Sequence, residues 1–213
     1  MIYHDDDYVT TFQNVLGYII GRTISNGYSP RFVERTIAYS SAFSLLEKSD
    51  ITELAFSPKE YIFERMFDIY ISNEFEYSPY DVYGWLGYTY IRLFFDLKIT
   101  FESLFFVLPI DEAINMYPLY HEMDYLQALE YVKGKVKYSL LDVIMSCRKM
   151  SSQKLSKISG VSRSTISALR YGKRDINKLE ARLLIKLSNA LRVKMESLLA
   201  DINLIFDQQQ KHI

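Results

Sequence analysis

The segment from Ser159 to Arg174 reads SGVSRSTISALRYGKR, and it decides how the C-terminal third of the chain is interpreted. Val161, Ile166 and Leu169 follow its glycine at the spacing expected for the buried face of a short helix. The hydroxyl groups and arginines between them must then lie on the opposite face of that helix. The sequence therefore raises the question of what this polar face contacts.

The composition predicts a folded, intracellular protein. With 213 residues, of which 49% are hydrophobic, the chain can form one large domain or two smaller ones. The single cysteine excludes an intramolecular disulfide and a zinc site built from several thiolates, which fits a reducing cytoplasm. The first residues, MIYHDDDYV, are acidic where a signal peptide is basic, and no long uncharged hydrophobic run follows. We therefore expect neither an export signal nor a membrane span.

Charge divides the chain into two parts. Residues 138–213 hold 14 Lys and Arg against 6 Asp and Glu, a net charge of +8, which leaves −9 for residues 1–137. Tyrosines divide at the same point, because 16 of the 18 precede residue 138. We place a domain boundary in VKGKVKYS, residues 132–139, and predict a first domain at 1–137 and a second at 138–213. The basic second domain is a candidate for binding nucleic acid.

The first domain has the pattern of an all-α bundle. Ser29-Pro30, Ser57-Pro58 and Ser78-Pro79 each place a capping hydroxyl before a proline that suits the first helical position. Another helix is predicted from about Tyr8 to Ser25, with Asn26-Gly27 as its stop. Further helices are expected after Thr100 and Asp124. We predict five to seven helices in this domain.

Two features of the first domain are weighed as chemical sites. His121 lies beside Glu122 and Asp124, but the sequence supplies no further metal ligands or acid–base partners, and Asp124 serves equally as a helix cap. The segment YDVYGWLGYTYIRLFF, residues 80–95, could form a cofactor or base-stacking surface, whereas its helical spacing favours core and helix–helix contacts. We predict no catalytic activity, cofactor or metal, and interpret the domain as a dimerisation or partner-binding module.

The second domain is predicted to contain five short helices. The first carries Leu140, Leu141, Ile144 and Met145, and ends near Lys149. Ser151 caps the second helix, Gly160 makes the turn, and Ser162 caps the third. A fourth helix starts at Asp175 or Asn177, and a fifth lies around Met195 to Leu199.

LSKISGVSRSTISALRYGKR followed by LLIKLSNALRVKMESLL resembles the Cro/C1-repressor-like (XRE) helix-turn-helix family over roughly Leu140 to Leu199. The resemblance implies a recognition helix that enters the major groove of DNA. Its implied DNA contacts come from the second helix of the motif, from the recognition helix, and from the segment behind it, where the family contacts phosphate. They are Ser152, Gln153, Ser162, Arg163, Ser164, Thr165, Ser167, Ala168, Arg170, Tyr171, Lys173 and Arg174. Arg163 suits a guanine edge, and Ala168 suits a thymine methyl; Arg148, Lys154 and Lys157 widen the basic face.

The chain departs from the family pattern at three places. The family often has Gln where Ser152 stands, and the nearest glutamine here is Gln153. It also often pairs an Arg in the first helix with a Glu at the end of the recognition helix, and Met145 and Arg170 occupy these positions. Because both have changed, no buried charge is stranded, and we expect Arg170 to be free to reach DNA or solvent. The loop after the recognition helix is about three residues longer than usual.

The first interpretation is a sequence-specific regulator that binds double-stranded DNA in the cytoplasm, acting as a dimeric repressor. One bidentate base contact discriminates by roughly 1–3 kcal/mol, too little to find one site in a genome, so a homodimer on two half-sites is expected. The first domain or the hydrophobic tail residues Leu204, Ile205 and Phe206 would hold it. The alternative is an antitoxin whose first domain binds a toxin and which autoregulates its operon. Two further interpretations are an enzyme targeted to DNA, and a solvated surface helix with incidental positive charge.

Overall fold

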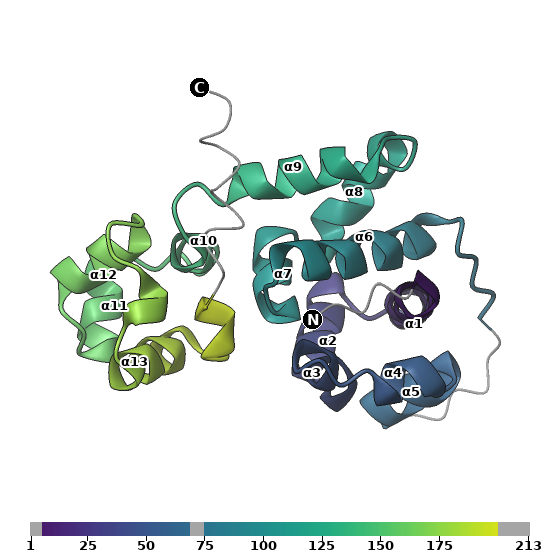
Figure 1. The fold of residues 1–213 in the computed structure, drawn as a ribbon, viewed down its shortest axis with the longest axis horizontal. Coiled ribbons are helices and arrows are strands. Elements are labelled where there is room, and N and C mark those ends of the chain that lie inside the picture. Colours follow the sequence, from purple (N-terminus) through teal and green to yellow (C-terminus); the bar gives the residue numbers. More distant parts are fainter. Residues whose placement is uncertain (1–5, 69–74, 200–213) are drawn as a thin grey trace. The chain divides into compact units, whose positions relative to one another are not determined.

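The computed structural model describes residues 6–68 and 75–199, and the secondary structure in these ranges is entirely helical (Figure 1). They contain thirteen α-helices and two short 3₁₀ helices, with no strand. This confirms the predicted all-α class. No helix in the described ranges is both long and apolar enough to cross a membrane. The tail residues Leu204, Ile205 and Phe206 lie outside them, so their predicted packing stays a prediction.

Contacts group the chain into two compact units. The first unit comprises residues 1–95 and 108–128, and the second comprises residues 96–107 and 129–213. The predicted boundary at residue 137 would have assigned residues 96–107 and 129–137 to the first domain. Both segments contact the C-terminal part of the chain instead, so the second unit is built from two separate pieces of sequence. How the sequence divides into domains stays a prediction.

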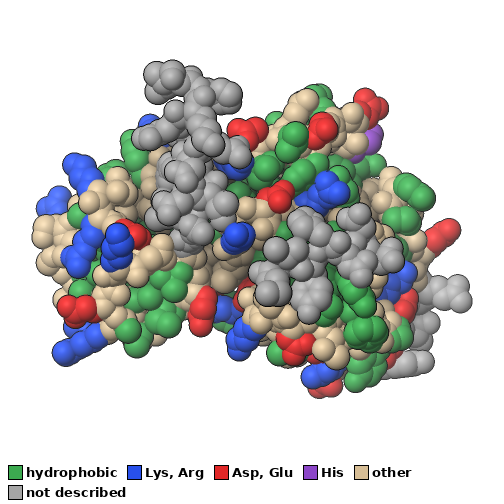
Figure 2. Space-filling view, in the orientation of Figure 1, with side chains coloured by type: hydrophobic (Ala, Val, Ile, Leu, Met, Phe, Trp, Pro, Cys, Tyr) green, Lys and Arg blue, Asp and Glu red, His purple; other side chains and the backbone are tan. Residues whose placement is uncertain are grey.

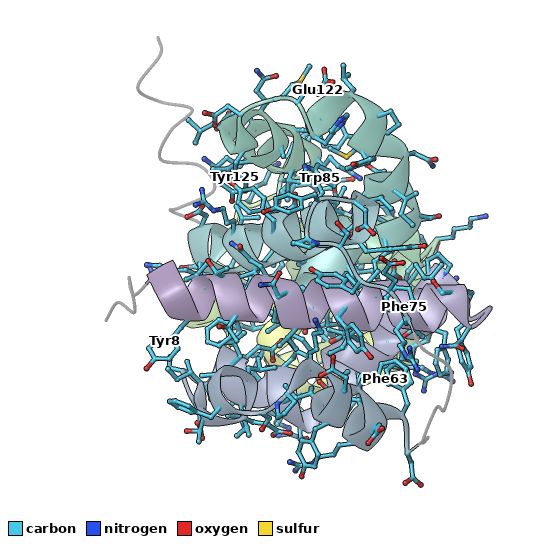
Figure 3. All side chains as sticks on the ribbon, turned by 90° about the vertical axis from the view of Figure 1, so that its right-hand side faces the viewer. Tyr8, Phe63, Phe75, Trp85, Glu122 and Tyr125 are labelled. Carbon is cyan, nitrogen blue, oxygen red and sulfur yellow. The ribbon has the colours of Figure 1, made fainter. Side chains whose placement is uncertain are left out.

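The first unit is built around the long helix α1, which packs against α2, α4 and α5. Figure 3 looks onto this helix, with Tyr8 near one of its ends and Phe63 and Phe75 near the other. Among the described residues before residue 137, nine α-helices begin, more than the five to seven predicted, because α3 and α4 are only 7 and 5 residues long and too short to show a period. The helices that lie in this unit or begin in it are α1 (Asp6–Ser25), α2 (Pro30–Tyr39), α3 (Ser41–Glu47), α4 (Thr52–Phe56), α5 (Lys59–Phe67), α6 (Val82–Leu97), α8 (Ile110–Tyr120) and α9 (Tyr125–Lys135).

Helices α1 and α6 approach each other at glycines. A Cβ atom at Gly87 would overlap the main-chain carbonyl oxygen of Gln13, and a Cβ at Gly17 would lie 2.6 Å from the carbonyl oxygen of Tyr83. The absence of side chains at Gly17 and Gly87 therefore allows the two backbones to come this close. Within the predicted aromatic segment, the Tyr83 ring lies against Gly21 of α1 and Tyr90 is fully buried, whereas Tyr80 is exposed.

Of the three helix caps predicted at Ser-Pro pairs in the first unit, one forms and two do not. The Ser29 hydroxyl accepts a hydrogen bond from the Phe32 amide ahead of Pro30, as expected. The predicted cap at Ser57 is wrong, because Pro58 takes the cap position of α5 and no side chain bonds there. The predicted start of a helix at Ser78-Pro79 is also wrong. Helix α6 begins only at Val82, and the Asp81 carboxylate accepts from the amides of Tyr83 and Gly84.

The second unit contains the predicted short helices of the C-terminal segment together with α7. Its elements are α7 (Phe101–Val107), α10 (Leu140–Cys147), α11 (Ser152–Ser159), α12 (Arg163–Arg170), η1 (Ile176–Lys178), α13 (Ala181–Leu191) and η2 (Glu196–Leu198). The predicted fourth helix is therefore two elements, since Asp175 caps only the 3₁₀ turn η1 and α13 starts at Ala181. The predicted fifth helix is the 3₁₀ turn η2. One hydrophobic cluster, which includes Ile144, Leu155, Ile166 and Leu187, forms the core.

Candidate nucleic-acid interface

Helices α11 and α12 are joined by a tight turn whose geometry follows from its residues. Ser151 caps α11 by accepting a hydrogen bond from the Lys154 amide at 3.1 Å. Gly160 ends this helix in the left-handed conformation, with φ of +69°, which favours glycine. The Ser159 hydroxyl donates a hydrogen bond to the carbonyl of Leu155 within α11 and accepts one from the amide of Val161 in the turn. Ser159 therefore links the turn to the end of α11.

Helix α12 is held by its hydrophobic side. Val161, Ile166 and Leu169 are buried in the core of the second unit, as the opening segment predicted. The Ser162 hydroxyl caps the helix by accepting from the Thr165 amide, and it also donates to the Thr165 hydroxyl at 2.8 Å. Ser162 and Thr165 therefore orient the first turn of the helix.

The other side of α12 faces outward. Arg163 and Ser164 are exposed, while Ser167 and Ala168 are half-buried. Within the described ranges, the Arg163 side chain makes no ion pair or hydrogen bond. The first turn of α12 thus presents a free guanidinium group and a hydroxyl group on a helix fixed from behind, an arrangement that suits reading base edges in a groove.

The remaining predicted contact residues surround this helix. They differ in solvent exposure, and only a residue that reaches the surface can contact DNA. Gln153, Tyr171, Lys173 and Arg174 are exposed, and Ser152 is half-buried near the start of α11. Figure 2 shows Lys and Arg side chains over the part of the molecule that contains α11–α13, with few acidic ones among them. The exposed predicted contacts therefore include the basic residues Arg163, Lys173 and Arg174, and the individual roles of all the predicted contacts stay predictions.

Arg170 differs from its prediction. Its Nε donates a hydrogen bond to the Asp142 carboxylate at 2.7 Å, and both side chains are mostly buried, 22% and 18% exposed. The prediction that Arg170 is free of an ion pair is therefore wrong, because α10 supplies an acid one turn before Met145. Asp142 is the only acidic residue between 131 and 174, and this isolation in a basic segment was the signal for a structural partner.

Arg148 also differs from its interpretation as part of the basic face. Its Nη2 donates to the carbonyl of Arg192 at 3.2 Å, and its guanidinium lies over the Phe106 ring, 5.2 Å from the centroid. Lys154 and Lys157 remain exposed on α11. The basic face therefore consists of α11, α12 and the loop behind α12.

His121, the candidate of the first unit, is engaged in packing contacts. Its ring stacks on Tyr117 with centroids 4.5 Å apart, and its Nδ1 lies 2.6 Å from the Tyr117 carbonyl oxygen. Glu122 Oε1 is 3.8 Å from its Nε2, and Asp124 accepts from the Leu126 amide at the start of α9. No group of three or more His, Cys, Asp or Glu side chains that could hold a metal occurs in the described ranges.

The comparisons with known proteins agree with this geometry. The family model of the Cro/C1-type HTH DNA-binding domain matches residues 140–203, which confirms the resemblance predicted for Leu140 to Leu199. Searches of curated proteins and of solved structures found no match for the chain. The matched residues include α11 and α12, the two helices predicted to form the helix-turn-helix, and the role of α12 as the recognition helix stays a prediction.

Proposed function

We propose that this chain, which carries a Cro/C1-type helix-turn-helix DNA-binding domain at residues 140–203, is a dimeric, sequence-specific transcriptional repressor. The observation that carries the proposal is the exposed first turn of α12, with Arg163 and Ser164 facing outward from a buried helix. The protein would act by occupying an operator that overlaps a promoter. The proposal assigns it no catalytic activity, and places it in the cytoplasm.

Arg163 is the residue on which specificity is proposed to depend. A guanidinium group donates two hydrogen bonds to a guanine edge, and one such contact contributes about 1–3 kcal/mol of discrimination. Lys173 and Arg174 would instead bind phosphate, which contributes salt-sensitive affinity without sequence preference. Substitution of Arg163 is therefore expected to reduce sequence preference, whereas substitution of Lys173 or Arg174 is expected to reduce affinity for all DNA sequences alike.

The experiment is a fluorescence anisotropy titration with duplex DNA from upstream of the protein's own gene and with scrambled DNA, at two salt concentrations. Arg163→Ala should lose about 10- to 100-fold in affinity for the preferred DNA and keep the weak, salt-sensitive binding. Arg182→Ala is the matched control, because Arg182 is an exposed arginine of α13 outside the helix-turn-helix. Equal binding of both DNAs by the wild type would contradict sequence-specific recognition.

The first unit is proposed to make the dimer. Tyr28, which precedes α2, and Phe32 and Tyr39, seven residues apart within it, are each between 36% and 54% exposed, and we call them the exposed aromatic face. Tyr28 and Phe32 stack with centroids 4.7 Å apart. Exposed aromatic residues are enriched at protein interfaces and support this proposal. Sedimentation of wild type and Phe32→Ser at micromolar concentration tests it, and a monomeric wild type would contradict it.

The same exposed aromatic face supports the second candidate, an antitoxin. In that case the face would bind a toxin protein, and the DNA-binding domain would regulate the operon of the pair. A neighbouring gene for a small protein that co-purifies with the wild type, but not with Phe32→Ser, would favour this candidate over the homodimer.

A further inference from the structure

Helix α7 completes the DNA-binding domain although it lies outside the residues that match the family. Glu102 is 6% exposed, and its Oε2 accepts hydrogen bonds from the Lys194 amide at 2.8 Å and from the Ser197 hydroxyl at 2.7 Å. Ser103 donates from its hydroxyl to the Ser197 carbonyl at 2.7 Å, and the Thr100 and Ser197 hydroxyls are 2.8 Å apart. A buried carboxylate is stable only with such partners, so α7 is fixed to η2.

The other end of α7 contacts the beginning of the helix-turn-helix region. The Phe106 ring packs against the hydrophobic cluster of the second unit and lies under the Arg148 guanidinium. The Cys147 thiol lies 3.5 Å from the Phe106 carbonyl oxygen. Helix α7 therefore contacts the end of α10, which is the first element of the matched domain, and η2, which is its last described element.

Helix α7 is joined to the first unit by short connections. Three residues separate it from the end of α6, and Leu108 and Pro109 separate it from the start of α8. Within the first unit, the Tyr90 hydroxyl donates to the Leu108 carbonyl at 2.8 Å, and Glu34 Oε1 accepts from the Ile110 amide at 2.8 Å. Because Leu108 directly follows Val107, the last residue of α7, these two hydrogen bonds anchor the chain immediately after this helix.

The path from α7 to the recognition helix runs through α10. Ser139 caps α10 and donates from its hydroxyl to the carbonyl of Arg170, the last residue of α12. Asp142 of α10 holds the Arg170 side chain. The end of α12 therefore depends on the position of α10, and α10 packs on α7.

We propose that α7 is a structural element of the DNA-binding domain, held in place by the hydrogen bonds of Glu102. We also propose that the first unit, through α7, controls how stable the positions of α10 and α12 are. Occupancy of the first unit by a protein or a ligand would change DNA affinity by this route. The part of the proposal that concerns DNA rests on the proposed function, whereas the mechanical link does not.

The test measures exchange of the Lys194 amide in the full chain by NMR, because this amide donates directly to Glu102. Tyr90→Phe removes the hydrogen bond to Leu108 and should raise exchange at Lys194 at least about fivefold. In a Glu102→Gln background, the same substitution should change exchange less than about twofold. Tyr61→Phe is the control, since Tyr61 is an exposed tyrosine of the first unit. Unchanged exchange at Lys194, with faster exchange near Leu108, would overturn the link.

Anisotropy with the preferred DNA decides whether the link controls binding. Tyr90→Phe should weaken binding at least about fivefold and Tyr61→Phe should not. Altered exchange with unaltered affinity would overturn the control of DNA binding, and a wild type without any preferred DNA would contradict the proposed function while leaving the exchange result intact. If Tyr90→Phe does not fold, reciprocity requires Glu102→Gln to raise exchange at the Ile110 amide, and no change there would overturn the proposal.

Discussion

Replacing Glu34 by glutamine should remove a pH dependence from the stability of the first unit. Burial raises the pKa of the Glu34 carboxyl from 4.5 to about 7, with a further contribution from nearby Asp111, although the Ile110 amide and Arg31 oppose it. In the folded protein Glu34 is therefore protonated at pH 6, whereas in the unfolded chain it is ionised. Folding takes up a proton between pH 4.5 and 7, so stability falls as the pH rises through this range.

The size of the effect follows from the two pKa values. A change from 4.5 to about 7 corresponds to about 3 kcal/mol, and partial solvent access of the side chain reduces the expectation to about 2 kcal/mol. Wild type should lose this much free energy of unfolding between pH 5 and pH 8, whereas Glu34→Gln should lose none of it. The two curves are compared by their slopes, because the added amide donor shifts the absolute stability.

Urea unfolding followed by tryptophan fluorescence suits this comparison. Trp85 is the only tryptophan in the chain and lies in α6 of the first unit, so its signal reports the relevant unit. Parallel pH curves for wild type and Glu34→Gln would refute the assignment of the proton to Glu34.

Other substitutions test the packing and the recognition helix. Gly87→Ala should destabilise the first unit by about 3 kcal/mol in urea unfolding, because its methyl group meets the main chain of α1, whereas Gly134→Ala, with open space around it, should be neutral or slightly stabilising. A double-mutant cycle with Asp142→Asn and Arg170→Gln should give a coupling energy of about 1–2 kcal/mol, and additive effects would show that the ion pair contributes nothing. Ser162→Ala should cost about 1 kcal/mol through the lost cap, measured by thermal unfolding.

Sequence patterns predicted the elements that depend on near neighbours. The caps at Ser29, Ser151 and Ser162 and the left-handed Gly160 are set by residues within one turn, so their patterns are visible in the sequence. The same holds for the buried side of α12. The caps at Ser57 and Ser78 failed because the same Ser-Pro pattern also occurs where a chain only approaches a helix.

Contacts between distant residues could not be predicted in this way. Glu102 and its partner amide at Lys194 are 92 residues apart, and Arg170 and Asp142 are 28 apart. No feature of the sequence around Glu102 indicates that its carboxylate accepts hydrogen bonds from a distant segment. Charge asymmetry located the DNA-binding domain correctly, but it could not show that a segment from the acidic part of the chain completes it.

The position of α7 in the sequence also determines the order in which the protein can fold during synthesis. The first unit ends at residue 128, so all its residues are synthesised before the helix-turn-helix. Two hydrogen-bond partners of Glu102, Lys194 and Ser197, are synthesised later still, 92 and 95 residues after it. The second unit can therefore complete its contacts with α7 only after these late residues have been made, whereas every residue of the first unit is already present by then.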